Sequence, residues 1–138
     1  MNHYGNPVFD CNGARLRAQS RRLATVVTIS GEVDMVNVDR VTEHARRYVL
    51  AATSVVLDLS GVLHMDDHGL ALLRAFDEDC AEAGQDWVLI PSDAVVDVLA
   101  GTSEAYPIAG SVPEALNHFA DETLRRRTLL LPLLNKSA

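Results

Sequence analysis

The segment from His64 to His68, His-Met-Asp-Asp-His, holds the densest group of side chains that could do chemistry. Two imidazoles beside two carboxylates suggest a metal site or a pH sensor, because histidine binds metals and titrates near neutral pH. The spacing spans a loop rather than one helical face, and no second ligand-rich segment is present. We therefore predict no metal and no cofactor, and we expect a partner contact or a solvated loop.

Three aspartates, Asp34, Asp58 and Asp66, suggest a second chemistry, since they lie at or near the ends of predicted strands. They would resemble the carboxylate cluster of response-regulator receivers, with Asp67 as a phosphoacceptor. Such receivers also use a lysine near their later strands, whereas the only lysine here is Lys136. The chain also lacks a glycine-rich phosphate loop, a Gly-x-Ser-x-Gly elbow and a His-Glu-x-x-His helix. These absences predict that the chain is not an enzyme.

Short β-branched and apolar runs predict the strands that would position these residues. An edge strand is expected over residues 15–19, joined by a hairpin to a strand over 24–30 that ends at Gly31. Continuous apolar runs predict buried strands over 55–59 and 87–90, with a loop from Gly61 to Asp67. A further short strand is expected near Pro107 and Ile108.

Apolar residues at helical spacing predict the intervening helices. One is expected over 38–49 with Asn37 as its N-cap, and a second over 69–83 with Gly84 after its end. A short helix should begin after Ser92 and end at Gly101, and Ser111-x-x-Glu114 is a capping box that opens the last helix. Strands alternating with helices predict an α/β fold: a mixed, mostly parallel sheet with an antiparallel edge strand and about four helices.

Length and composition restrict the function classes. A chain of 138 residues, 48% of them hydrophobic, suits one domain with a packed core, and a net charge of −7 argues against direct nucleic-acid binding. The first ten residues lack an apolar secretory core, and no apolar stretch approaches the roughly 20 residues that span a membrane. We expect a cytoplasmic protein without membrane contact. Cys11 and Cys80 are expected as reduced thiols, with a disulfide switch left open.

Two segments closely resemble the signature of the STAS domain, the fold of bacterial anti-sigma factor antagonists. Residues 55–73 read VVLDLSGVLHMDDHGLALL, and residues 29–34 read ISGEVD, similar to that family's Gly-Glu-Leu-Asp strand end. The resemblance covers residues 15 to 122. It implies a STAS-like domain over 15–124, preceded by a flexible arm over 1–14 and followed by a Leu/Arg extension over 125–138. The matching residues are Asp58, Leu59, Ser60, Gly61, Val62, Met65, Asp66, Gly69 and Leu70.

The resemblance also implies a partner. In that family the unphosphorylated antagonist binds an anti-sigma factor with an ATPase-like kinase fold, and phosphorylation of a serine after the signature aspartate ends the complex. Asp67 occupies the place of that serine and is the phosphosite equivalent, so no switching by serine phosphorylation is expected there. The resemblance predicts regulation of sigma factor release, through partner-binding residues Leu63, His64, Met65, Asp66, Asp67, His68 and Leu70.

Three alternatives stay open. The domain is also similar to STAS modules that sense ligands or attach to transporters. The chain could form a homodimer. The extension over 125–138 combines three arginines with leucines, and it suits packing on its own domain, docking to a partner, or a dimer contact.

Overall fold

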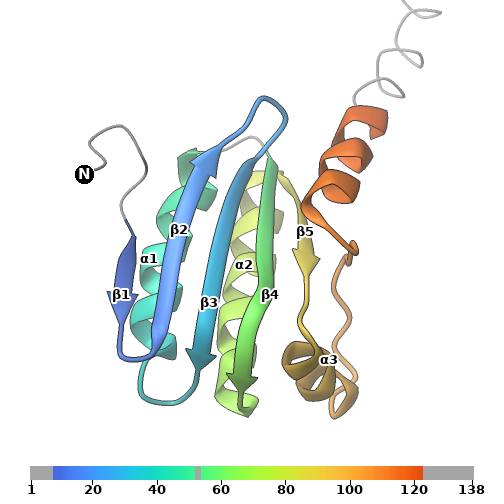
Figure 1. Ribbon diagram of the computed structural model, residues 1–138. Coiled ribbons are helices and arrows are strands. Elements are labelled where there is room, and N and C mark those ends of the chain that lie inside the picture. The colour runs from blue at the N-terminus through green and yellow to red at the C-terminus, as the bar shows by residue number, and fades with distance from the viewer. Residues whose placement is uncertain (1–7, 52–53, 123–138) are drawn as a thin grey trace, which may run out of the picture.

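A computed structural model describes residues 8–51 and 54–122, and it shows an α/β fold built on one five-stranded sheet (Figure 1). The strands lie in the order β1-β2-β3-β4-β5, so neighbours in the sheet are also neighbours in the chain. Antiparallel pairs join β1, β2 and β3, and parallel pairs join β3, β4 and β5, which confirms the predicted mixed sheet. The strand bounds are Phe9–Cys11, Ala14–Ser20, Thr25–Val33, Ser54–Met65 and Asp86–Ile90.

The outermost strand differs from the predicted one. Residues Phe9–Cys11, which fall in the expected flexible arm, form β1 and pair with β2, so residues 15–19 do not lie at the edge. Cys11 is buried against the core, and this burial stabilises the added strand. Residues 1–7 of the expected arm lie outside the described residues.

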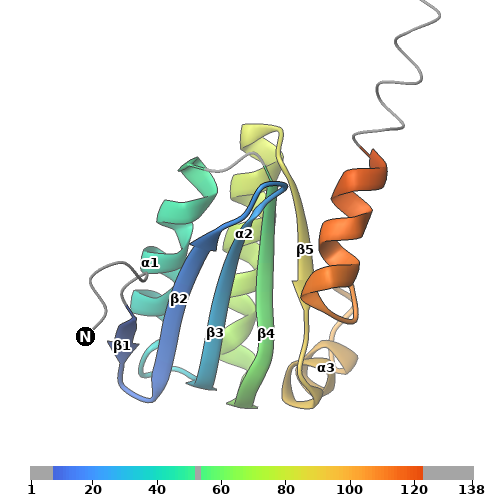
Figure 2. The ribbon, with the colours of Figure 1, turned by 45° about the horizontal axis from the view of Figure 1, so that its top comes forward.

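Two helices cross one face of the sheet and join its parallel strands (Figure 1). Helix α1, Val38–Ala51, connects β3 to β4, and α2, Leu70–Ala83, connects β4 to β5. Their apolar faces pack on the sheet through fully buried residues such as Val41, Leu73 and Phe76. The opposite face is covered in part by a helix over residues 112–122, which lies beside β5 in both views (Figure 2). Its buried Ala115 and Phe119 belong to a second, smaller apolar cluster.

Strands β3 and β4 run further than predicted. Gly31 was expected to end β3, but the strand continues to Val33, and the expected loop after Gly61 is strand as far as Met65. Gly31 has a φ of +94°, and a Cβ atom there would lie 2.2 Å from the carbonyl oxygen of Gly13. Only glycine allows this close approach of two backbones, so the residue bends the strand instead of ending it.

Asn37 directly precedes α1, as predicted for its N-cap, but its side-chain oxygen accepts from the Asp34 amide at 3.1 Å and not from an amide of the helix. Its side chain is fully buried, and its Nδ2 donates to the carbonyl oxygens of Cys11, Asn12 and Glu32 at 3.3, 3.1 and 2.8 Å. The backbone amides of Val36 and Asn37 are instead bound by the Asp34 carboxylate, at 2.9 and 3.3 Å. Asn37 thus ties the β1–β2 turn to the end of β3.

The predicted helix ends at Gly84, Ser92 and Ser111 are confirmed. Gly84 takes the left-handed conformation after α2, with a φ of +68°, and the Ser92 side chain accepts from the Val95 amide at the start of α3, Asp93–Ala100. The Ser111 hydroxyl accepts from the Glu114 amide at 3.2 Å. Of the predicted strand near Pro107, the structure shows one parallel bridge between Ile108 and Leu89. No helix within residues 8–51 and 54–122 combines the length and apolarity that a membrane crossing needs.

Candidate functional site

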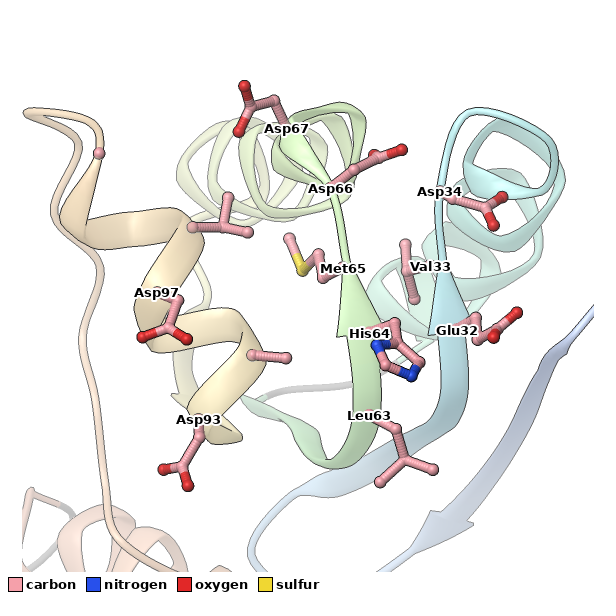
Figure 3. Close-up of a pocket in the computed structure, with 13 residues that line it drawn as sticks. Glu32, Val33, Asp34, Leu63, His64, Met65, Asp66, Asp67, Asp93 and Asp97 are labelled. Carbon is pink, nitrogen blue, oxygen red and sulfur yellow. The ribbon is translucent and has the colours of Figure 1, made fainter.

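A groove of about 660 Å³ lies where β3 and β4 end and α3 packs beside them (Figure 3). Parallel strands bring their carboxyl ends to one edge of a sheet, which is where α/β folds commonly place binding sites. Among the residues that the structure describes, no lysine or arginine lines the groove. It does contain six carboxylates, those of Glu32, Asp34, Asp66, Asp67, Asp93 and Asp97.

Strand register brings the two halves of the sheet side of the groove together. Glu32 lies opposite His64, and Val33 lies opposite Met65, after a register shift between Gly31 and Glu32. The extra residues at the ends of both strands therefore put Glu32 and His64 side by side on neighbouring strands at the groove (Figure 3). The predicted loop after Gly61 would not have placed them so.

The helical turn after β4 presents Asp67. The Asp66 carboxylate accepts from the His68 amide at 2.9 Å and caps the short 3-10 helix η1, Asp67–Gly69. The His68 Nδ1 also lies 3.4 Å from the same Asp66 oxygen. Asp67 is exposed and has no ion pair with any described residue, so its charge faces solvent at the rim of the groove. A carboxylate at this place is also favoured by the first turn of the helix.

Gly69 fixes how closely this turn approaches the strand. A Cβ atom at residue 69 would lie 2.5 Å from the Met65 Cε and 2.6 Å from its Cγ. Met65 therefore packs directly over the glycine backbone and anchors the turn that carries Asp67. The packing of Met65 against Gly69 explains why these two residues belong to the signature, and no role in a reaction is needed to explain them.

The structure brings most of the predicted site residues to one surface. Leu63 is 72% exposed, and His64, Asp66, Asp67 and His68 are also exposed. Leu70 differs, because only 7% of it is accessible and its side chain belongs to the core cluster. It supports the surface from within and is not available for contact.

Sequence reasoning missed the wall formed by α3 and β3. Asp93 and Asp97 lie four residues apart on α3, with Val95 buried between them on the other face. That spacing was a usable signal, since residues four apart share one side of a helix. The predicted aspartate cluster is only partly formed, because Asp34 and Asp66 line the groove whereas Asp58 lies further back on β4. The Asp58 carboxylate accepts from the amide and hydroxyl of Ser60.

The electrostatics of the groove favour a positively charged occupant. Five of its carboxylates, those of Glu32, Asp34, Asp67, Asp93 and Asp97, have no ion pair among the described residues. Like charges around one depression repel each other and strengthen the local negative field. Within the part of the chain that the structure describes, no three His, Cys, Asp or Glu side chains gather as metal ligands.

A side-chain cluster holds the segment after α3 against α2. The Arg74 guanidinium donates to Glu104 through Nε at 2.7 Å and through Nη2 at 2.9 Å, and the Tyr106 hydroxyl donates to the same carboxylate at 2.9 Å. The hydrogen bonds from Arg74 and Tyr106 lower the pKa of Glu104 to about 2. Burial and the Glu104 carboxylate raise the pKa of Tyr106 to about 12. This cluster fixes the chain directly behind the α3 wall of the groove.

The two cysteines are free thiols, and both are buried. Burial, with the nearby charges of Asp79, Asp77 and Asp86, raises the pKa of Cys80 to about 11. A buried thiol with a raised pKa is a poor nucleophile, so Cys80 acts as an apolar core residue.

Comparison with known proteins agrees with this architecture. The STAS domain family model matches residues 15–105. Osmosensory protein A of Mycobacterium tuberculosis is 46% identical over 140 residues, which cover 97% of this chain and 89% of that protein. Two solved structures are similar in fold. An anti-sigma factor antagonist from Mycobacterium paratuberculosis has a TM-score of 0.64 and 24% identity, over 78% of this chain and 94% of that one. The antagonist SpoIIAA in its unphosphorylated form has a TM-score of 0.61 and 17% identity, over 77% and 96%.

The family match extends from β2 through α3 and the segment behind it, so it includes both strand ends, η1 and the acidic wall of the groove. The 46% identity to a curated relative extends over nearly the whole chain. The chain belongs to the STAS domain family.

Proposed function

We propose that this protein is an anti-sigma factor antagonist-like regulator, which binds an anti-sigma factor of the ATPase/kinase-like kind and so controls sigma factor release. Family membership supports the class, and two fold neighbours are named as anti-sigma factor antagonists. The proposed function is binding and contains no catalytic step. It acts inside the cytoplasm, where sigma factors act.

The observation that carries the proposal is the exposed surface around η1. Leu63 is 72% exposed beside a row of unpaired carboxylates, and Asp67 stands at the rim with its charge free. Exposed apolar side chains that lie together and are rimmed by polar residues mark protein-binding surfaces. The partner-contact residues are Leu63, His64, Asp66, Asp67 and His68, with Met65 and Leu70 as internal supports.

Asp67 determines how the interaction is regulated. A phosphoserine would carry about −1.5 to −2 charges at neutral pH, and a serine kinase cannot create it on an aspartate. Asp67 instead holds a permanent charge of about −1 at the start of η1. The interaction is therefore independent of serine phosphorylation at this position. Its control comes from other inputs, and the 46% identical relative, named for osmosensing, makes osmotic stress the first input to examine.

The test is calorimetric titration of the purified protein with each anti-sigma factor kinase of its own cell, before and after addition of ATP. Wild type is compared with Asp67→Ser, with Asp67→Lys, and with Asp121→Ser as a control at an exposed acid on the helix over 112–122. We expect wild type and the Asp121 variant to bind equally, and Asp67→Lys to weaken binding at least tenfold, which is about 1.4 kcal/mol. We expect Asp67→Ser to bind and to become releasable by phosphorylation.

Two results would redirect the proposal. Binding by Asp67→Ser alone would show that Asp67 is a built-in negative signal that keeps the protein from its partner. No binding by any variant to any of these kinases would refute the antagonist function.

A further inference from the structure

The groove combines unpaired negative charge with exposed apolar side chains. Beside its carboxylates lie three large apolar residues that no described residue covers: Met35 at 66% exposure, Val36 at 67% and Leu63 at 72%. Met35 and Val36 directly follow the lining residue Asp34, and Leu63 is itself part of the lining. Such a surface best fits a segment that presents positive charge and apolar side chains together.

The chain itself contains a segment with this chemistry. The C-terminal extension, residues 125–138, holds four of the twelve lysines and arginines of the protein, and it has no acidic residue. It also contains five leucines, at 129, 130, 131, 133 and 134. The positive charges and the leucines of the extension complement the negative charges and the exposed apolar side chains of the groove. The rest of the protein has a strongly negative net charge.

We infer that the C-terminal extension of one copy binds in the acidic groove of a second copy. Arg125, Arg126 and Arg127 face the carboxylates of the groove, among them Asp93 and Asp97 on α3, and the leucines cover Leu63 and its apolar neighbours. The contact joins two different surfaces, so it is heterologous, and copies associate head to tail.

Chain geometry places the arginines in a second copy rather than in the same one. Glu122, the last described residue, lies beside Gln85 and Asp86, and Asp86 pairs with Ser54 at the start of β4. The groove lies at the other end of β4, near His64 and Met65, which is about 33–36 Å away at 3.3 Å per strand residue. Figures 1 and 2 agree that the helix over 112–122 runs toward the end of the sheet opposite the β4 arrowhead. Arg125–Arg127 follow Glu122 by three to five residues, which span about 10–18 Å at full extension.

This contact has a regulatory consequence that rests on the proposed function. A groove occupied by the extension of a neighbouring copy cannot accept an anti-sigma factor. Self-association would then compete with partner binding and would lower the concentration of the active monomer. The self-association itself can be measured without any partner, so the two proposals can fail separately.

The test uses two full-length variants in sedimentation equilibrium. The groove variant, Asp93→Arg/Asp97→Arg, keeps its own extension but reverses the charge of two of the six carboxylates in the groove. The extension variant, Arg125→Glu/Arg126→Glu/Arg127→Glu, keeps its groove but has a reversed tail. Glu78→Arg/Glu82→Arg, which reverses two exposed acids four residues apart on α2, is the matched control for charge.

We expect wild type and the α2 control to self-associate at about 0.05 M salt and to dissociate at about 0.5 M, because screening weakens contacts between exposed charges. Each groove or extension variant alone should be monomeric. An equimolar mixture should recover association, because the native extension of the groove variant complements the native groove of the extension variant. A monomeric wild type at every concentration, or a mixture that stays monomeric, would overturn the inference.

A second measurement covers the case in which the reversed groove fails to fold, as shown by circular dichroism. A synthetic peptide of residues 125–138 is titrated into the extension variant and into the extension variant carrying Asp93→Asn/Asp97→Asn. We expect the peptide to bind at least tenfold more weakly to the protein that carries Asp93→Asn/Asp97→Asn. Equal affinity for both proteins, or peptide binding to vesicles of anionic lipid but to neither protein, would contradict it.

Discussion

Arg74 and Glu104 are separated by 30 residues in the chain, yet their side chains form two parallel hydrogen bonds of 2.7 and 2.9 Å. Arg74 lies on α2, and Glu104 lies in the segment that follows α3. The Thr102 hydroxyl also lies 3.2 Å from the Glu104 carboxylate and accepts from the Glu104 amide at 2.7 Å. This cluster holds the segment after α3 in place, behind the groove residues Asp93 and Asp97. It helps to position these two residues and does not itself line the groove.

The first prediction concerns acid pH and Glu104. Its pKa falls from 4.5 to about 2 on folding, mainly through the hydrogen bonds from Arg74 and Tyr106, so its ionised form stabilises the native state. Because the folded-state pKa is depressed, this contribution is present above pH 4.5 and is lost as the pH falls toward 2. Glu104→Gln should therefore be less stable than wild type at neutral pH, and the difference should shrink between pH 4.5 and 2.

Urea unfolding of both proteins across this pH range measures the difference directly. Asp121→Asn, at an exposed acid outside this cluster, serves as the control and should show a difference that does not vary in this way. A Glu104→Gln difference that stays constant from pH 7 to pH 2 would show that the cluster does not stabilise the ionised carboxylate.

The second prediction concerns the buried amide of Asn37. Asn37→Leu keeps the size of the side chain but leaves the carbonyls of Cys11, Asn12 and Glu32 without their donor. Buried acceptors without partners are costly, so we expect a loss of about 2–4 kcal/mol in the free energy of unfolding. Asn117→Leu, at an exposed site in the helix over 112–122, should change stability by less than about 0.5 kcal/mol. Equal effects at both positions in chemical denaturation would refute the role of Asn37.

The third prediction separates two glycines with positive φ. Gly31→Ala would force a Cβ atom to 2.2 Å from the Gly13 carbonyl oxygen, whereas no atom lies within 4 Å of a Cβ at Gly84. Gly84→Ala should therefore cost only the conformational penalty of about 1–2 kcal/mol. Gly31→Ala adds a backbone clash and should cost about 3 kcal/mol or more. Thermal and urea unfolding rank the two variants, and a smaller loss at Gly31 would contradict the close approach of the strands.

The fourth prediction concerns Cys80. Its pKa of about 11, against 9.0 for an unperturbed thiol, leaves about a hundredfold less thiolate at pH 8, and burial restricts access further. A thiol reagent should therefore label Cys80 at least about a hundredfold more slowly in the native protein than in denaturant. Because burial raises this pKa, Cys80 contributes stability below pH 9 that is lost as the pH rises toward 11. Mass spectrometry identifies the labelled residue, and rapid labelling of native Cys80 would revive a redox function for it.

The sequence predicted helix ends correctly where one residue restricts the backbone conformation or supplies a local hydrogen bond. Gly84, Ser92 and Gly101 mark helix ends because their conformations or hydrogen bonds are local, and these predictions are confirmed. The alternation of apolar runs with helical spacing was enough to predict the mixed sheet, because parallel strands need helical crossovers. The signature from Asp58 to Leu70 led to the STAS family because its residues combine strand, turn and close packing in one short stretch.

Tertiary structure decided the rest, since long-range contacts set it. The acceptors of the Asn37 side-chain amide lie up to 26 residues away, so its position before α1 could be predicted from the sequence but its buried hydrogen bonds could not. Strands β3 and β4 continue beyond Gly31 and Gly61 because each strand supplies backbone hydrogen-bond partners to the other. The sequence of either strand alone does not show this pairing. The acidic groove arises only when α3 folds beside these strand ends, bringing Asp93 and Asp97 to Asp67. Residue types thus determined the elements and the family, and packing between distant segments determined the site, because side chains far apart in sequence share a surface only after folding.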